Sequence, residues 1–77
     1  MRRCKLMTMF IAYTRLTVAE LEADIPKAIK GIEDWFEANP DRDDCNTQLW
    51  MGKELTVSRE NIETEVRALA AAIETKP

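Results

Sequence analysis

The residue types that most often perform catalysis are scarce in this chain of 77 residues. It contains no histidine, the side chain best suited to exchanging protons near neutral pH. The one serine, Ser58, stands where we predict a helix cap, and Gly31 and Gly52 are isolated, so there is no phosphate-binding loop. Glu33 and Glu37 would share one helix face, but a solvated surface explains them better than acid–base chemistry does. We therefore expect a protein that is not an enzyme and uses no cofactor.

Metal and redox sites also lack their usual spacing. The two cysteines, Cys4 and Cys45, form no Cys-x-x-Cys motif. Without histidine a metal site would need carboxylates alone, and residues 41–44 match only part of a calcium loop, without its glycine and final glutamate. We therefore expect no bound metal. We also expect reduced thiols, as in other cytoplasmic proteins, although the sequence leaves open whether the two cysteines pair.

The carboxylates are concentrated in the middle of the chain. Residues 1–15 carry four basic side chains and no acidic one, whereas residues 16–46 carry nine acidic side chains against three basic ones. A local negative surface can bind a basic protein through complementary charge, and an aromatic ring beside it can anchor the contact. The residues predicted to form this partner-binding surface are Glu33, Asp34, Phe36, Glu37, Asp41, Asp43 and Asp44. The simpler interpretation is a solvated helix end, with Trp35 and Trp50 in the core and Phe36 at its edge.

A second set of residues could bind a small anionic ligand. An aromatic ring can stack on a nucleotide base while basic side chains hold its phosphates. The residues with these properties are Tyr13, Arg15, Lys27, Lys30 and Arg67. Alternatively, the basic side chains on the helices simply pair with Asp34 and Glu63. Binding of nucleic acid itself is not expected, because a sequence pI of about 4.9 leaves no broad basic surface.

The acidic surface depends on a first helix predicted over residues 17–38. Thr17 and Glu20 match a capping box, in which each side chain bonds the other residue's main-chain N–H. The residue before Pro40 is pushed out of the helical region, which ends the helix. Pro26 removes one hydrogen bond inside it, so we expect a kink or a broken first turn. Apolar residues three and four apart predict one buried face, formed by Val18, Leu21, Ile25, Ala28, Ile32 and Trp35.

The second half of the chain predicts a β-hairpin followed by a helix. The hairpin covers residues 48–57, with Gly52 and Lys53 in a two-residue turn that places Trp50 opposite Leu55. A second helix covers residues 59–75, with Ser58 as its cap and a fraying tail from Glu74. Its apolar stripe is Ile62, Val66, Leu69 and Ile73.

These elements predict a single α+β domain over residues 1–77. If residues 8–14 form a strand, the order is β-α-β-β-α, and otherwise it is helix–hairpin–helix. The alternative is an all-α helical hairpin, in which residues 46–75 form one helix. A chain of this size has a thin core, so we expect a homo-oligomer or a bound partner. No segment matches a signal peptide or spans a bilayer, so we expect a cytoplasmic protein.

In size and composition the chain resembles the short acidic accessory proteins of bacteriophages, many of which are counter-defence factors that sequester a host component. Within that class, residues 13–17 (Tyr-Thr-Arg-Leu-Thr) and 66–68 (Val-Arg-Ala) are similar to a family of helical-hairpin sponges for cyclic oligonucleotide signals. That resemblance implies that Tyr13 stacks on a base and Arg67 holds phosphate. The helix–hairpin–helix order is also similar to that of small phage head-completion proteins.

The missing catalytic groups, the thin core and the acidic middle of the chain together favour a binding protein. The leading hypothesis is an inhibitor or adaptor that sequesters a host protein with a basic surface. The first alternative is an oligomeric sponge for a cyclic nucleotide immune signal. The second alternative is a small structural component of a virion.

Overall fold

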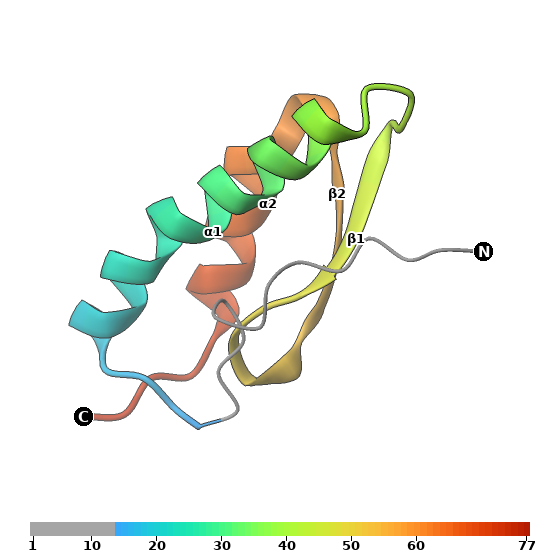
Figure 1. Cartoon of the computed structure of the whole chain (residues 1–77). Coiled ribbons are helices and arrows are strands. Elements are labelled where there is room, and N and C mark those ends of the chain that lie inside the picture. The colour runs from blue at the N-terminus through green and yellow to red at the C-terminus, as the bar shows by residue number, and fades with distance from the viewer. Residues whose placement is uncertain (1–13) are drawn as a thin grey trace.

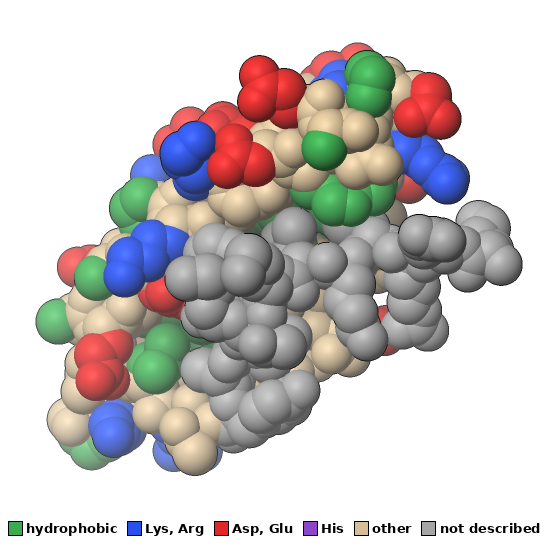
Figure 2. Space-filling model, in the orientation of Figure 1, with side chains coloured by type: hydrophobic (Ala, Val, Ile, Leu, Met, Phe, Trp, Pro, Cys, Tyr) green, Lys and Arg blue, Asp and Glu red, His purple; other side chains and the backbone are tan. Residues whose placement is uncertain are grey.

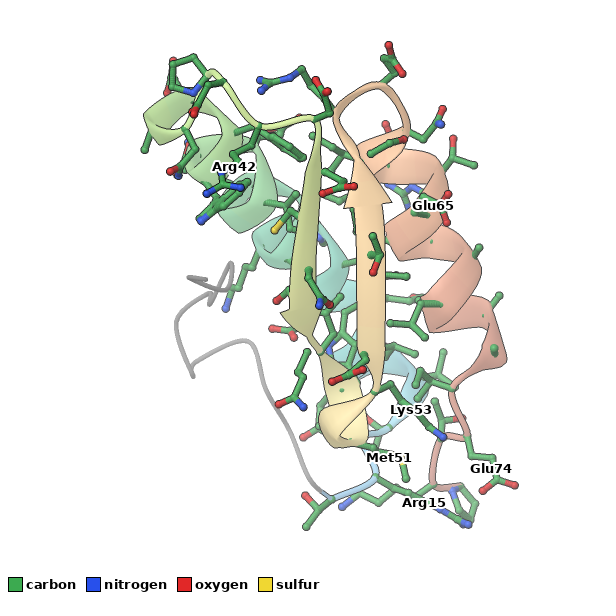
Figure 3. All side chains as sticks on the ribbon, turned by 90° about the vertical axis from the view of Figure 1, so that its right-hand side faces the viewer. Arg15, Arg42, Met51, Lys53, Glu65 and Glu74 are labelled. Atoms are coloured by element: carbon green, nitrogen blue, oxygen red, sulfur yellow. The ribbon has the colours of Figure 1, made fainter. Side chains whose placement is uncertain are left out.

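The computed structural model describes residues 14–77, in which two helices and a two-stranded antiparallel sheet are formed. The bounds of the elements are α1 (Val18–Ala38), β1 (Asp44–Gln48), η2 (Trp50–Gly52), β2 (Glu54–Ser58), η3 (Arg59–Asn61) and α2 (Ile62–Ala72), where η marks a short 3-10 helix. Both helices lie on the same face of the sheet, and they run in opposite directions (Figures 1 and 3).

This arrangement confirms the predicted α+β class. The all-α alternative is wrong, because two paired strands occupy residues 44–58, where it required helix. The strands contain Thr56 and Val57, and β-branched side chains of this kind favour extended backbone. Apart from Thr14, the third strand predicted over residues 8–14 lies outside the described residues.

The first helix has the predicted bounds and the predicted cap. The Glu20 N–H donates to Thr17 Oγ1 at 3.1 Å, and the Thr17 N–H donates to Glu20 Oε1 at 2.8 Å. The helix continues across Pro26 without interruption, so the expected broken first turn is wrong. Ile25 and Ala28 are buried on either side of the proline, and packing of an apolar face supplies most of a helix's stability in a folded protein.

The hairpin has a different register from the predicted one. Thr47, not Trp50, is opposite Leu55, and Cys45 is opposite Val57. The side chains of Cys45, Thr47 and Val57 are buried under the helices. The alternate residues of both strands are polar and form the other face of the sheet, namely Asp44, Asn46, Gln48, Glu54, Thr56 and Ser58. The strands cover residues 44–48 and 54–58, so the predicted bounds of the hairpin, residues 48–57, are wrong.

The turn is longer than predicted because it buries two large apolar side chains. Leu49 and Trp50 are fully buried, and Trp50 Nε1 donates a hydrogen bond of 2.6 Å to Asp24 Oδ2 on α1. The chain reverses at Met51, whose φ of 58° is left-handed, and at the following glycine. Burying one such side chain stabilises by about 3 kcal/mol. That gain exceeds the cost of a left-handed residue, which is about 1 kcal/mol.

The second helix is shorter than the predicted range of residues 59–75. It begins at Ile62, after η3, and Ser58 does not cap it. Instead, Ser58 Oγ accepts a hydrogen bond of 3.0 Å from Asn61 Nδ2. The apolar stripe is confirmed, since Val66 and Ile73 are buried and the other two members pack partly buried against the core.

The C-terminal tail does not fray as predicted. The Lys76 N–H donates to the Leu16 carbonyl at 2.9 Å, and Lys76 forms an isolated parallel bridge with Thr17. Beside it, Arg15 Nη2 donates to Glu74 Oε1 at 2.7 Å. The tail is therefore attached to the start of α1, which the sequence pattern did not indicate.

Candidate functional site

The predicted acidic residues come together at one end of the molecule. Three are on the last turns of α1, two are in the loop that follows, and one opens β1. All six are exposed: Glu33, Asp34, Glu37, Asp41, Asp43 and Asp44. We call these six residues the acidic end. Figure 2 shows acidic side chains over the upper part of α1 and at the adjoining tip of the molecule.

An open cleft of about 440 Å³ lies within the acidic end. Its lining residues are Lys30, Glu33, Asp34, Phe36, Glu37, Arg59 and Ile62. Three of these are carboxylates, and two, Phe36 and Ile62, are apolar. Lys30 is already engaged, because its Nζ lies 3.2 Å from Asp34 Oδ1 in an ion pair one helical turn along α1.

Arg59 holds the loop that carries the acidic residues. Its Nη2 donates to the carbonyls of Asn39 at 3.3 Å and Pro40 at 3.1 Å, and also to the carbonyl of Arg42. Its main-chain N–H donates to the carbonyl of Asp43 at 3.0 Å. Carbonyls just beyond a helix C-terminus carry partial negative charge, so a guanidinium group is well suited to bind them. Arg59 therefore sets the path of the chain between α1 and β1.

Phe36 supports this arginine and is not an exposed anchor. Its side chain is only 3% exposed, and the Arg59 guanidinium carbon lies 4.7 Å from the centre of its ring. Trp35 contacts the same ring edge to face, with centroids 5.3 Å apart, and is itself only partly buried. The prediction that Trp35 is buried and Phe36 lies at the edge is therefore reversed. The buried face of α1 continues from Ile32 by four residues rather than three.

The second predicted set of residues is not gathered into one site. Tyr13 lies outside the described residues. Arg15 pairs with Glu74. On the helices, Lys30 pairs with Asp34, and Arg67 Nε lies 2.8 Å from Glu63 Oε2, so these basic side chains pair with carboxylates of the same helix. Lys27 is exposed. Lys30 lines the cleft at the acidic end, whereas Arg67 lines a different one.

The sequence pattern did not indicate two side chains that join distant segments of the fold, Arg59 and Asp24. Arg59 reaches carbonyls 17 to 20 positions earlier in the chain, and Asp24 accepts from Trp50, which is 26 positions later. Neither contact has a local sequence signal, because both depend on where the hairpin packs against α1. The one indirect hint was that a buried tryptophan N–H needs an acceptor.

The cysteines and candidate metal ligands add no second site within residues 14–77. In this range no group of three or more Cys, Asp or Glu side chains is arranged to hold a metal ion. Cys45 is fully buried and is not a free thiol. The expectation of reduced thiols is therefore wrong for Cys45, whereas Cys4, the other cysteine of the chain, lies outside the described residues.

Comparison with known proteins identifies no relative of this chain. No family model, no curated protein and no solved structure matches it. Over the described part of the chain, neither helix has the length and apolar character needed to cross a membrane. The site must therefore be interpreted from its own geometry.

Proposed function

We propose that this chain is a non-enzymatic binding protein whose acidic end captures a protein with a basic surface, so that it acts as an inhibitor or adaptor. The observation that carries this proposal is the arrangement of six exposed carboxylates, drawn from a helix, a loop and a strand, on backbone that Arg59 holds in place. A charged surface that is already ordered loses little conformational entropy on binding. It also attracts a basic partner from a distance.

The cleft suits the side chain of a lysine or arginine. Ile62, which is half-buried, provides apolar surface for an aliphatic stem, and the exposed Glu33 and Glu37 provide carboxylates for its charged head. Long basic side chains bind in this divided way, with the stem on apolar atoms and the charge at a polar rim. This chemistry supports a basic protein as the partner.

The two alternative functions receive less support from the geometry. A cyclic nucleotide sponge needs basic side chains that converge on phosphates, but Arg15, Lys30 and Arg67 each pair with a carboxylate of this chain, and the last two line separate clefts. A rise in melting temperature with any of a panel of cyclic nucleotides would support the sponge function instead. No feature of the described residues favours a structural component of a virion, for which ring assembly in sedimentation would be the evidence.

Two double variants with the same net charge test the proposal. In the first, Glu37→Lys and Asp43→Lys reverse charge at the acidic end. In the second, Glu54→Lys and Glu74→Lys reverse charge at the start of β2 and on the C-terminal tail, at the opposite end of the molecule (Figure 3). Tagged wild-type protein and both variants are used to capture partners from a lysate of the host cell, at low and high salt.

We expect the wild type and the second variant to capture the same basic protein and the first variant to lose it. Capture should also weaken in high salt, since at 1 M the screening length is about 3 Å. Equal capture by the two variants would mean that the acidic end does not bind the partner. Absence of any captured protein with the wild type would contradict the proposal as a whole.

A further inference from the structure

A second cleft lies between the two helices, toward the start of α1 and the end of α2. It has a volume of about 310 Å³ and differs in character from the acidic cleft, since most of its lining is apolar. The apolar residues that line it are Val18, Leu21, Ile25, Ala70, Ala71 and Ile73. Val18 is the most prominent of them, because 54% of its surface is exposed.

The surface around this cleft is well suited to close contact with another helix pair. Ala71 on α2, which lines the cleft, and Pro26 on α1, which follows the lining residue Ile25, are both exposed. Alanine and proline lose almost no side-chain entropy when they are buried. Small side chains also allow two helices to approach closely. Their presence alone does not specify what binds, and the charges at the rim of the cleft supply that information.

The rim of the cleft carries one charge of each sign, on opposite sides. Glu22 lies on the α1 side and Arg67 on the α2 side. Glu22 forms no ion pair within residues 14–77, and Arg67 is held only by the pair with Glu63, an exposed pair of the kind that contributes little to stability. A rim with this layout is complementary to its own copy.

A two-fold axis parallel to the cleft brings these charges together. Such an axis lays α1 of one copy on α2 of the other and keeps each residue at its height along the cleft. Glu22 lies four residues after the start of α1 and Arg67 five residues before the end of α2, and both line the cleft between these two helix ends, so Glu22 of each copy faces Arg67 of the other. The same operation sets the exposed Val18 against the last turn of α2 in the second copy, around Ala71.

The geometry points to this cleft as a self-association surface, through which two copies of the chain form a two-fold dimer with reciprocal pairs of Glu22 and Arg67. The dimer leaves the acidic end of each copy free, so it presents two such ends. This inference does not rest on the proposed function, because no residue of the acidic end takes part in it.

Charge reversal provides a specific test by analytical ultracentrifugation over a wide range of protein concentrations. We expect the wild type to dimerise. Glu22→Arg alone and Arg67→Glu alone should each weaken the dimer roughly tenfold or more, because each creates two like-charge contacts. An equimolar mixture of the two variants should associate again, since every contact between unlike chains then joins a glutamate to an arginine.

Two further variants control for folding and for surface charge in general. Ala71→Arg, at an exposed position in the cleft, should also dissociate the dimer, whereas Thr56→Arg on the polar face of the sheet should not. Circular dichroism of each variant verifies that it is folded. A wild type that stays monomeric at all concentrations, or a mixture that fails to associate, would overturn the inference. Capture of a basic partner by such a monomer would show that the proposed function stands without it.

Discussion

The free main-chain groups at the two ends of α1 are hydrogen-bonded by different means. At its N-terminus, Thr17 and Glu20 bond each other's main-chain N–H groups across three positions. At its C-terminus, no basic side chain of the last turn is available, and the carbonyls beyond the helix are bound by Arg59 from the other side of the hairpin. The first closure is entirely local in sequence, whereas at the second the local hydrogen bonds from Asn39 to the carbonyls of Trp35 and Phe36 are joined by bonds that form only when the chain has folded.

The two ends of α1 therefore depend to different degrees on the rest of the chain. A helix start that is closed by its own residues needs little from the rest of the chain, and the tail that joins it at Leu16 adds one further hydrogen bond. The loop of the acidic end, in contrast, has its carbonyls bound by Arg59, which comes from beyond the hairpin. The strongly charged acidic end is therefore supported by long-range structure, and the variants described next test that contrast.

The largest effect is expected from Arg59→Ala. It removes hydrogen bonds to the carbonyls of three residues and the contact with the Phe36 ring, and should lower the free energy of unfolding by about 2 kcal/mol. Urea denaturation measures it. Arg59→Lys keeps the charge without the planar group, and we expect a smaller loss. If the alanine variant were as stable as the wild type, the long-range closure would have no energetic importance.

An intermediate effect is expected from Thr17→Ala. Loss of a capping hydroxyl costs about 1 kcal/mol, because the Glu20 N–H loses its acceptor. The double variant with Arg59→Ala should show additive losses within about 0.5 kcal/mol, since the two sites share no partners. Clear non-additivity in urea denaturation would show that the two ends of α1 are coupled, contrary to the comparison.

The smallest effect is a pH dependence that arises at the N-terminal end of α1, at Glu20. The Thr17 N–H, the Thr17 hydroxyl and, to a lesser degree, the charge of Lys76 lower the pKa of Glu20 below its ordinary value of 4.5. The associated stability is fully present above the pKa of the unfolded chain and is lost as the pH falls through the lowered value. Glu20→Gln retains an acceptor but does not titrate.

We therefore expect the stability of the wild type relative to Glu20→Gln to be greatest near neutral pH and to decline toward pH 3. Thermal melts of both proteins across this range measure the difference. A constant difference would mean that the carboxylate of Glu20 gains nothing from its charge in the folded protein.

Much of the first helix could be predicted from the sequence, because its signals are local. The capping box, the stop before Pro40 and the spacing of Leu21, Ile25, Ala28 and Ile32 are all visible along a few turns. The end of that buried face was ambiguous, since either Trp35 or Phe36 continues the spacing. Packing against Arg59 and the hairpin decided for Phe36.

The hairpin, in contrast, could be predicted only in part, because its register depends on long-range packing. Gly52 indicated that the chain turns, but the register depends on which side chains the helices can bury. A turn that encloses Leu49 and Trp50, with Asp24 as acceptor for the indole N–H, is favoured over the shortest turn. That choice involves residues 26 positions apart, which no local pattern encodes.

The sequence by itself determined the composition of the acidic end and the helix that carries half of it, because charge and short-range hydrogen bonding are properties of neighbouring residues. Only the tertiary structure decided how the loop that carries part of it is held, since Arg59 reaches the main-chain carbonyls of that loop through the folding of the hairpin. It also decided that Phe36 supports this surface from beneath and that a second, apolar cleft opens between the helices. Contacts between distant segments depend on how apolar surface is buried across the whole chain, and that balance is settled only when the elements pack together.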